Sequence, residues 1–367
     1  MRILAVDIGT GTQDIVLLDS EQPVENAVQL ILPSPTVIVA ERIREATRAG
    51  QPVFLTGRMM GGGPCHWAAL DHIRAGFPVY ATPVAAQTFD DDLAAVERMG
   101  VRLVAGEAEV PEGAVRIELR DFYYPEILAA LRLFGVKAEP DVVAVAVFDH
   151  GAAPPGYSDR RFRFEYLARR LREAGGLSGF AYLKPHIPEF LTRLWAVADS
   201  FDGPQPLLVM DTGPAAILGT LEDERVRASS ERLVVNVGNF HTLAFYLRNG
   251  EILGLFEHHT GELDRAKLEA YLEKLAAGTV TNDEVFADMG HGALVFEPPR
   301  RRAGEVLLAV TGPRRGLLRG SRLRPYFAVP HGDMMLAGCF GLVRAFADHY
   351  PPVREAWERV LKLSTVG

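Results

Sequence analysis

Cysteine is scarce in this chain, and its scarcity excludes several kinds of site. The 367 residues include two cysteines, Cys65 and Cys339, which lie far apart in the sequence. Two cysteines cannot build a disulfide scaffold, a four-cysteine zinc site or a cysteine-ligated iron–sulfur cluster. Long apolar runs are also lacking, since the most apolar stretches have the length of strands, and no signal region precedes the first strand pattern. We therefore expect a reduced, cytoplasmic protein that does not span a membrane.

Positive charge is in short supply as well. Lysine and arginine together number 39 against 47 acidic residues, which gives a formal net charge of −8 at pH 7. A chain with this balance repels phosphate backbones on average, so nucleic acid is not expected as a partner. With 48% hydrophobic residues the composition is that of a globular protein, and the length predicts two or three domains of about 100–200 residues each.

The chain opens with two short strands joined by a turn rich in glycine and threonine. Apolar residues at 3–8 and 15–18 flank the turn, which is typical of a β-hairpin, and a third run at 27–32 completes a predicted meander. A tight glycine turn presents backbone N–H groups and hydroxyls to one point, which suits phosphate oxygens. Asp7, at the end of the first strand, is placed to hold hydrated Mg²⁺, although aspartate and glycine are also ordinary turn residues.

The middle of the chain alternates strands with helices, which predicts a largely parallel sheet covered by helices. After residue 230 the opening pattern returns, with a meander at 233–256 and the segment Asn236-Val237-Gly238-Asn239 in its first turn. Asn249-Gly250 joins the next two strands and is a strong hairpin signal. The chain therefore consists of two related halves, and we expect a boundary near residue 230.

Two further turns lie where strands of the predicted parallel sheet end. Because ligands of such sheets bind beyond the carboxyl ends of the strands, we predict substrate-binding residues there. The residues are Gly61, Gly62 and Gly63 in one turn, with Asp149 and His150 in the other. A close-packed strand-to-helix turn and a buried, hydrogen-bonded histidine are equally consistent with these segments. Histidines recur in loops, but no two have the i, i+4 spacing of a helical zinc motif, so a histidine metal site has little support.

The order of these motifs resembles the superfamily of actin, DnaK-type chaperones and sugar kinases. The segment 7–12 resembles the first phosphate motif of that superfamily, and 236–242 resembles the second, with Asn236 where an acidic residue or a glycine-rich turn is usual. The segment 310–313 resembles the adenosine motif, with Pro313 in place of its second glycine, and 332–341 resembles the small-residue helix that follows. The segment 210–219 is similar to the part of FGGY-type kinases that carries the catalytic aspartate.

The resemblance implies an α/β fold of two ribonuclease H-like (actin-like ATPase) domains around a central cleft. The first would span residues 1–229 with α/β insertions, and the second 230–367. ATP and Mg²⁺ are the implied cofactors, with Asp7 at the metal. The implied nucleotide-binding residues are Asp7, Gly9, Thr10, Gly11, Thr12, Gly238, Asn239, Gly312 and Gly338. Asp211 is the implied general base, with Asp149 and His150 as alternatives on the substrate side; an N-cap role for Asp211 remains open.

The activity implied is phosphoryl transfer from ATP to a small hydroxylated or carboxylated metabolite. The alternative is an ATP-binding activator that acts on a partner enzyme, or a nucleotide-free ligand-binding protein, which the departures at Asn236 and Pro313 favour. More closely, the chain resembles a family labelled "putative pyruvate formate-lyase activating enzyme", through the segments 7–14, 60–64 and 149–151. That label implies a cluster held by three closely spaced cysteines, which this chain does not supply, so a radical iron–sulfur enzyme is not expected.

Overall fold

The first half of the chain builds a six-stranded sheet around the opening meander. The computed structural model describes residues 1–364. Strand β1 pairs antiparallel with β2 and parallel with β8, while β8 in turn pairs parallel with β10. The strand order is β3-β2-β1-β8-β10-β9. Their bounds are β1 (Arg2–Ile8), β2 (Thr12–Asp19), β3 (Val28–Pro33), β8 (Val142–Val147), β9 (Ala181–Leu183) and β10 (Leu207–Asp211).

The second half repeats this arrangement in a second six-stranded sheet. Its meander is β11-β12-β13, and β15 pairs parallel with β11 as β8 does with β1. The strand order is β14-β13-β12-β11-β15-β16. This repeated order confirms the predicted fold class of two ribonuclease H-like (actin-like ATPase) domains. The strands are β11 (Glu231–Val237), β12 (His241–Arg248), β13 (Glu251–His259), β14 (Gly292–Val295), β15 (Leu307–Thr311) and β16 (Tyr326–Phe327).

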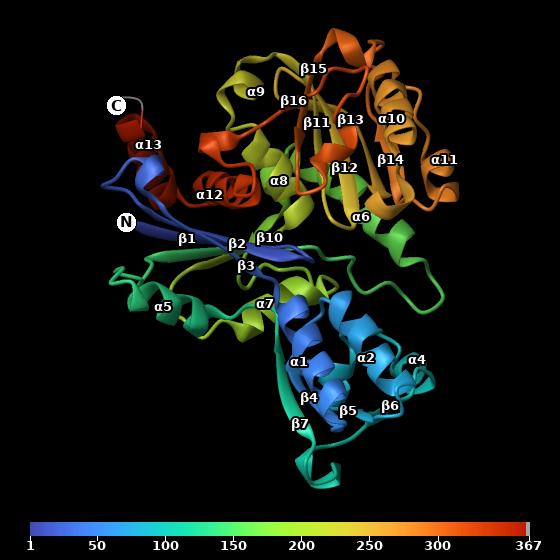
Figure 1. Cartoon of the computed structure of the whole chain (residues 1–367). Helices are drawn as coiled ribbons and strands as arrows, with labels where there is room; N and C mark the ends of the chain where they lie inside the picture. Colours follow the sequence, from blue (N-terminus) through green and yellow to red (C-terminus); the bar gives the residue numbers. More distant parts are fainter. Residues whose placement is uncertain (365–367) are drawn as a thin grey trace.

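Helices α8 (Thr212–Thr220) and α12 (Ala337–His349) lie between the two sheets (Figure 1). Their backbones approach closely, because a Cβ on Gly341 of α12 would overlap the carbonyl oxygen of Ala215, and one on Gly219 that of Ala337. The largest buried apolar cluster joins both helices and α13 (Pro351–Ser364) to the facing sides of both sheets. Thus α12 and α13 belong to the cluster that contains the first sheet, although they follow the second sheet in the sequence. The domain boundary predicted near residue 230 stays a prediction.

The chain passes between the sheets twice, and one side chain joins the two passages. Asp223 precedes α9 (Glu224–Ala228) on the way to β11. Its Oδ2 accepts hydrogen bonds from the Tyr326 hydroxyl at 3.0 Å and the Val329 backbone N–H at 2.9 Å, where the chain returns. The outgoing and returning segments therefore lie side by side.

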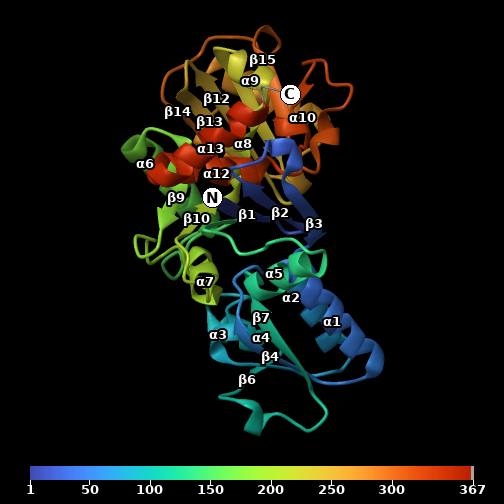
Figure 2. The ribbon, with the colours of Figure 1, turned by 90° about the vertical axis from the view of Figure 1, so that its left-hand side faces the viewer.

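A third sheet forms a separate lobe with its own core (Figure 2). The alternating segment is thus divided: β8 joins the first sheet, and the earlier strands form a four-stranded parallel sheet in the order β6-β5-β4-β7. Its elements are α1 (Pro35–Ala49), β4 (Val53–Arg58), α2 (Pro64–Arg74), β5 (Val79–Ala81), α3 (Pro83–Ala86), α4 (Leu93–Arg98), β6 (Val101–Leu103) and β7 (Val115–Arg120).

The remaining helices pack on the two large sheets. In residues 1–364 no helix combines the length and the apolar character that crossing a membrane requires. These helices are α5 (Tyr124–Leu133), α6 (Asp159–Ala174), α7 (Thr192–Ser200), α10 (Arg265–Ala277) and α11 (Asn282–Ala287).

Candidate functional site

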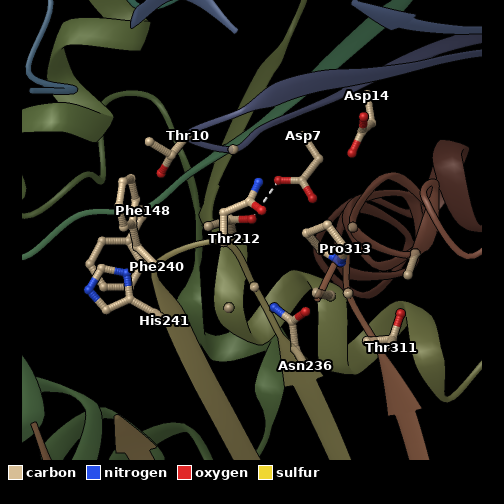
Figure 3. A pocket seen from close by; sticks show the side chains of 18 of the residues that line it. Asp7, Thr10, Asp14, Phe148, Thr212, Asn236, Phe240, His241, Thr311 and Pro313 are labelled. Carbon is tan, nitrogen blue, oxygen red and sulfur yellow. Dashed lines mark hydrogen bonds between the residues drawn. The ribbon is translucent and has the colours of Figure 1, made fainter. Parts of the chain in front are cut away.

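A pocket opens between the two halves, where the two meanders face each other (Figure 3). The first half contributes the β1–β2 turn and the start of α8. The second half contributes the β11–β12 turn, the end of β15 and the approach to α12. Among the predicted nucleotide-binding residues, those that line the pocket are Asp7, Gly9, Thr10, Thr12, Gly238, Asn239, Gly312 and Gly338.

The two glycine turns have the same construction. The Gly9 N–H donates to the Thr12 carbonyl at 2.9 Å, and the Gly238 N–H donates to the His241 carbonyl at 3.0 Å. They also meet across the pocket, since a Cβ on Gly11 would lie 2.8 Å from the Asn239 side-chain nitrogen. Gly11 therefore faces the opposite turn at close range rather than lining the cavity. Two matched turns that converge from separate domains can enclose a chain of phosphates from both sides.

Two carboxylates lie side by side at the inner end of the pocket. Asp7 and Asp14 are cross-strand partners on β1 and β2, and both are buried. Burial raises the pKa of Asp7 to about 7. Burial and then the charge of Asp7 raise the pKa of Asp14 to about 8. The Thr212 hydroxyl donates to Asp7 Oδ1 at 2.6 Å (Figure 3), whereas Asp14 Oδ1 has no hydrogen-bond partner. Paired carboxylates with an unsatisfied oxygen and nearby hydroxyls are a donor set that fits Mg²⁺.

The segment predicted to approach adenosine forms the far wall of the pocket. Gly312 has φ +97°, and a Cβ there would collide with Val237 and Asn236 of the second glycine turn. The Arg314 N–H donates to the Val237 carbonyl at 3.0 Å, which holds Pro313 against the cavity. At the start of α12, Gly338 lies against the Asp7 carboxylate, where a Cβ would overlap it. Gly312 thus allows close approach between β15 and the β11–β12 turn within the second half, and Gly338 between α12 and β1 of the first half.

Asp211, the base implied by the resemblance, lies behind the pocket wall with both oxygens engaged. Its Oδ1 accepts from the Gly213 N–H at 3.0 Å, so it caps α8, which is the second role considered from the sequence. The fully buried Arg163 donates to its Oδ2 at 2.6 Å and to its Oδ1 at 3.2 Å. Arg163 also binds Glu257 through Nε and Nη2 at 2.8–3.1 Å. This buried ion triad joins α6 and β10 of the first half to β13 of the second.

A second, wider pocket continues from the first, and Phe148 and Arg193 line both. Gly61, Gly62, Gly63, Asp149 and His150, the predicted substrate-side residues, all line the second pocket. Burial raises the pKa of Asp149 to about 6, while its oxygens accept backbone N–H groups of Gly151, Arg193 and Leu194. Burial lowers the pKa of His150 to about 3, so its imidazole is neutral.

The structure adds residues that the sequence analysis did not single out. Asp14 could have been found from hairpin register, because a turn closed between Gly9 and Thr12 places it opposite Asp7. Arg163 stands four residues before Leu167 on the buried face of α6, so an arginine at an apolar position was a usable signal. Arg193, whose Nε binds Asp121 at 3.1 Å, carries no comparable signal.

Comparison with known proteins gives a family and several distant structural likenesses. A family model described as "Putative pyruvate format-lyase activating enzyme (DUF1786)" matches residues 60–317. No curated protein matches the chain. Both cysteines are free and buried, Cys65 in α2 and Cys339 in α12, where its Sγ donates to the Asp14 carbonyl at 3.0 Å.

Three solved structures illustrate the structural likeness. The activator of 2-hydroxyisocaproyl-CoA dehydratase from Clostridium difficile, with bound ADPNP, is 10% identical over 97% of this chain and 98% of its own, at a TM-score of 0.33. ROK hexokinase from Thermus thermophilus is 11% identical over 95% of this chain and 100% of its own, at a TM-score of 0.30. MreB5 of Spiroplasma citri, bound to ADP, is 11% identical over 96% of this chain and 98% of its own, at a TM-score of 0.35. These TM-scores are too low to assign a fold, so the fold is assigned from the strand order described above.

Proposed function

We propose that this chain, which belongs to the DUF1786 family, binds ATP–Mg²⁺ in the pocket between its halves and transfers the γ-phosphoryl group to a small hydroxylated molecule. The observation that carries the proposal is the convergence of two matched glycine turns and a buried pair of carboxylates on one cavity. The two turns occupy equivalent places in the repeated meander, and the carboxylates lie on the first meander, so the arrangement follows from the fold and not from a chance loop.

Different residues of the pocket would bind different parts of the nucleotide. Asp7 and Asp14 would hold Mg²⁺, with Thr212 fixing the orientation of Asp7. The Gly9–Thr12 and Gly238–His241 turns would enclose the phosphates, and the Gly312–Pro313 wall would take the adenosine. When bound, Mg²⁺ would neutralise the negative charge that develops on the leaving phosphate oxygen during transfer. The pKa values of Asp7 and Asp14, raised by burial to about 7 and 8, support a site completed by a cation.

The second pocket is the proposed acceptor site. It meets the nucleotide pocket at Phe148 and Arg193, so an acceptor oxygen there can face the terminal phosphate. Five aspartates line it: Asp90, Asp91, Asp92, Asp149 and Asp159. Carboxylates accept hydrogen bonds from hydroxyl groups and repel another carboxylate, so this lining favours a polyol or sugar over an organic acid. Arg193 is placed to stabilise charge on the transferred group.

Asp149 and His150 are the groups nearest to such an acceptor among the predicted catalytic residues. Asp211 has no free oxygen, because Arg163 and the α8 N-terminus occupy both. Phosphoryl transfer passes through a loose transition state that needs more positioning than proton abstraction. We therefore assign Asp211 a positioning role in this scheme and place the acceptor hydroxyl beside His150 and Asp149.

The test has two steps. A ligand at 100 times its Kd raises the free energy of unfolding by about 2.7 kcal/mol, so millimolar ATP with Mg²⁺ should raise Tm, and ATP with EDTA should do so much less. Nucleotide consumption is then measured against a panel of polyols, sugars and organic acids. Absence of a Tm shift at millimolar ATP–Mg²⁺ would refute nucleotide binding. Binding without acceptor-dependent consumption would refute the transferase.

A second candidate function is an ATP-binding activator that acts on a partner enzyme. The engagement of Asp211 favours it, because the aspartate that the kinase resemblance implies as base is not free. In this case ATP should be bound and slowly hydrolysed with no acceptor, and protease accessibility of the cleft should differ between the ATP and ADP states.

A further inference from the structure

Three histidines from separate segments converge at the junction of the two pockets. His150 follows β8 in the first half, while His241 begins β12 and His291 precedes β14 in the second. One nitrogen of each ring lies within 4.8 Å of the corresponding nitrogens of the other two. The three histidines have no helical spacing, because strand pairing and not a helix brings them together: the His291 N–H donates to the Glu257 carbonyl at 2.9 Å.

We propose that His150, His241 and His291 form a binding site for a divalent first-row transition metal such as Zn²⁺, with a fourth position open to the pocket. This site is distinct from the proposed Mg²⁺ site at Asp7 and Asp14. Imidazole nitrogens suit zinc and its neighbours, whereas magnesium prefers carboxylate and water oxygens. The inference does not depend on nucleotide binding.

Unsatisfied nitrogens are the first support. His291 is 1% exposed, yet neither of its ring nitrogens has a hydrogen-bond partner, and the buried Nε2 of His241 has none either. Leaving buried polar atoms without partners is costly, and a metal that takes their lone pairs would remove part of that cost. Burial lowers the pKa of His150, His241 and His291, so the rings are neutral, which is the form that binds metals.

Ring packing is the second support. His241 stacks on Phe148 with centroids 3.8 Å apart and planes at 8°, and both lie on the same side of the pocket (Figure 3). The rings of His150 and His291 are nearly parallel, with an angle of 18° between their planes and 5.6 Å between their centroids. Zinc–nitrogen distances of about 2.1 Å place tetrahedral ligands about 3.4 Å apart, so the three rings need only a small inward movement.

The residues around the three histidines orient the rings, and the nearby arginines are engaged with other groups. His259, the cross-strand partner of His241, packs against His291 with centroids 4.7 Å apart and has its Nδ1 2.7 Å from the Met289 carbonyl. On the other face of Phe148, the Arg163 guanidinium lies 3.7 Å from the ring centroid. Arg163 is itself paired with two carboxylates, Asp211 and Glu257, so its guanidinium is not an unpaired positive charge beside the cluster. The other guanidinium groups that face the cluster are Arg193, paired with Asp121, and Arg160, bound to the Gly290 carbonyl.

Catalytic zinc sites commonly have three protein ligands and one open coordination position, which water or a substrate oxygen fills. Three histidines would supply this number of ligands. Since His150 comes from the first half and the other two from the second, the bound metal would also join the halves across the cleft.

The experiment uses the untagged full chain, freed of metal with EDTA and then of EDTA. Zn²⁺ affinity is measured by competition with a chromophoric chelator, and Co²⁺ serves as a spectroscopic probe of tetrahedral coordination. We expect one equivalent of tightly bound Zn²⁺ per chain. His150→Ala, His241→Ala and His291→Ala should each weaken binding by more than 100-fold, while His186→Ala, an exposed control, should leave it unchanged.

Because His291 is buried, the Tm of each metal-free variant is measured as well. His150 and His241 are only half-buried, so their variants keep the test valid if His291→Ala fails to fold. Two results would overturn the proposal: Zn²⁺ binding to the wild type weaker than millimolar, or wild-type affinity in both His150→Ala and His241→Ala.

Discussion

Asp211 holds Arg163 with both carboxylate oxygens, at 2.6 and 3.2 Å, and the pair is fully buried between the two halves. Arg163 also binds Glu257 of the second sheet, so Asp211, the base implied by the resemblance, is also part of an ion triad that joins the two halves. This relationship changes what a substitution at Asp211 should do.

Removing the Asp211 carboxylate should chiefly destabilise the fold. Breaking a buried ion pair from one side typically costs about 3–5 kcal/mol, so we expect Asp211→Ala to lower the free energy of unfolding by that order, with Asp211→Asn less affected. Urea unfolding measures the change. Asp199→Ala, which breaks the exposed Arg58–Asp199 pair, is the control and should cost about 1 kcal/mol or less. A folded Asp211→Asn with wild-type stability but no phosphoryl transfer would restore the role of base.

The contribution of Asp14 to the free energy of unfolding of the metal-free protein should fall as pH rises from about 4 to about 8. An unfolded Asp14 ionises near pH 3.8, while burial and Asp7 raise the folded pKa to about 8, so the folded state binds more protons in this range. Asp14→Asn should therefore be more stable than the wild type at pH 8, by at least about 1 kcal/mol, and little different at pH 4. Urea unfolding in EDTA at both pH values tests this.

Mg²⁺ should reverse that order at pH 8, because it favours the ionised carboxylates of the wild type and finds a weaker site in the Asn variant. A difference between the two proteins that does not change with pH would show that Asp14 is not a titrating group of the pocket.

Thr212→Val should weaken ATP–Mg²⁺ binding without unfolding the protein. The substitution keeps the shape of the side chain but removes the hydrogen bond to Asp7 Oδ1, which is worth about 1 kcal/mol, or roughly five- to tenfold in Kd. Thr220→Val is a matched control in the same helix, because Thr220 does not line the pocket and its hydroxyl donates to the Ala216 backbone carbonyl, not to Asp7. Isothermal titration with ATP–Mg²⁺ compares them. Equal affinities would argue against Asp7 as the metal residue.

Gly341→Ala should destabilise the protein because α12 and α8 leave no room for a methyl group at this crossing. The added Cβ would overlap the Ala215 carbonyl, which is backbone and cannot turn away. Overpacking of this kind costs about 1–3 kcal/mol or more. Gly261→Ala, where a Cβ meets nothing within 4 Å, should change the free energy of unfolding by less than about 0.5 kcal/mol. Equal Tm values for the two variants would contradict the close packing.

Local patterns were enough to predict both meanders and the family. Asn249 and Gly250 have φ of +52° and +86°, the positive values that an Asn-Gly hairpin turn requires, so that prediction is confirmed. The family resemblance, carried by the segments 7–14, 60–64 and 149–151, is likewise confirmed by the match over residues 60–317. These features depend on neighbours in sequence, which is why they could be predicted.

Long-range pairing could not be predicted in the same way. Strands β4 and β8 are similar apolar runs, and nothing local says that one belongs to a separate lobe and the other beside β1. The start of helix α1 is also hard to predict, because Pro33-Ser34-Pro35 is typical of a chain breaker, yet proline is favoured in the first helical turn, where Pro35 lies. The arginine triad and the three histidines depend on pairing between halves, and no spacing within one segment encodes them.

Asp223 makes the two connections between the halves a single mechanical element. Since its carboxylate oxygen binds both Tyr326 and Val329, the outgoing and returning segments are tied to each other. We therefore expect any rotation of the halves to centre on this edge, with a displacement that grows with distance from it. The glycine turns lie at the pocket, so we expect a small turn at Asp223 to change the separation of Gly11 and Asn239 around a ligand.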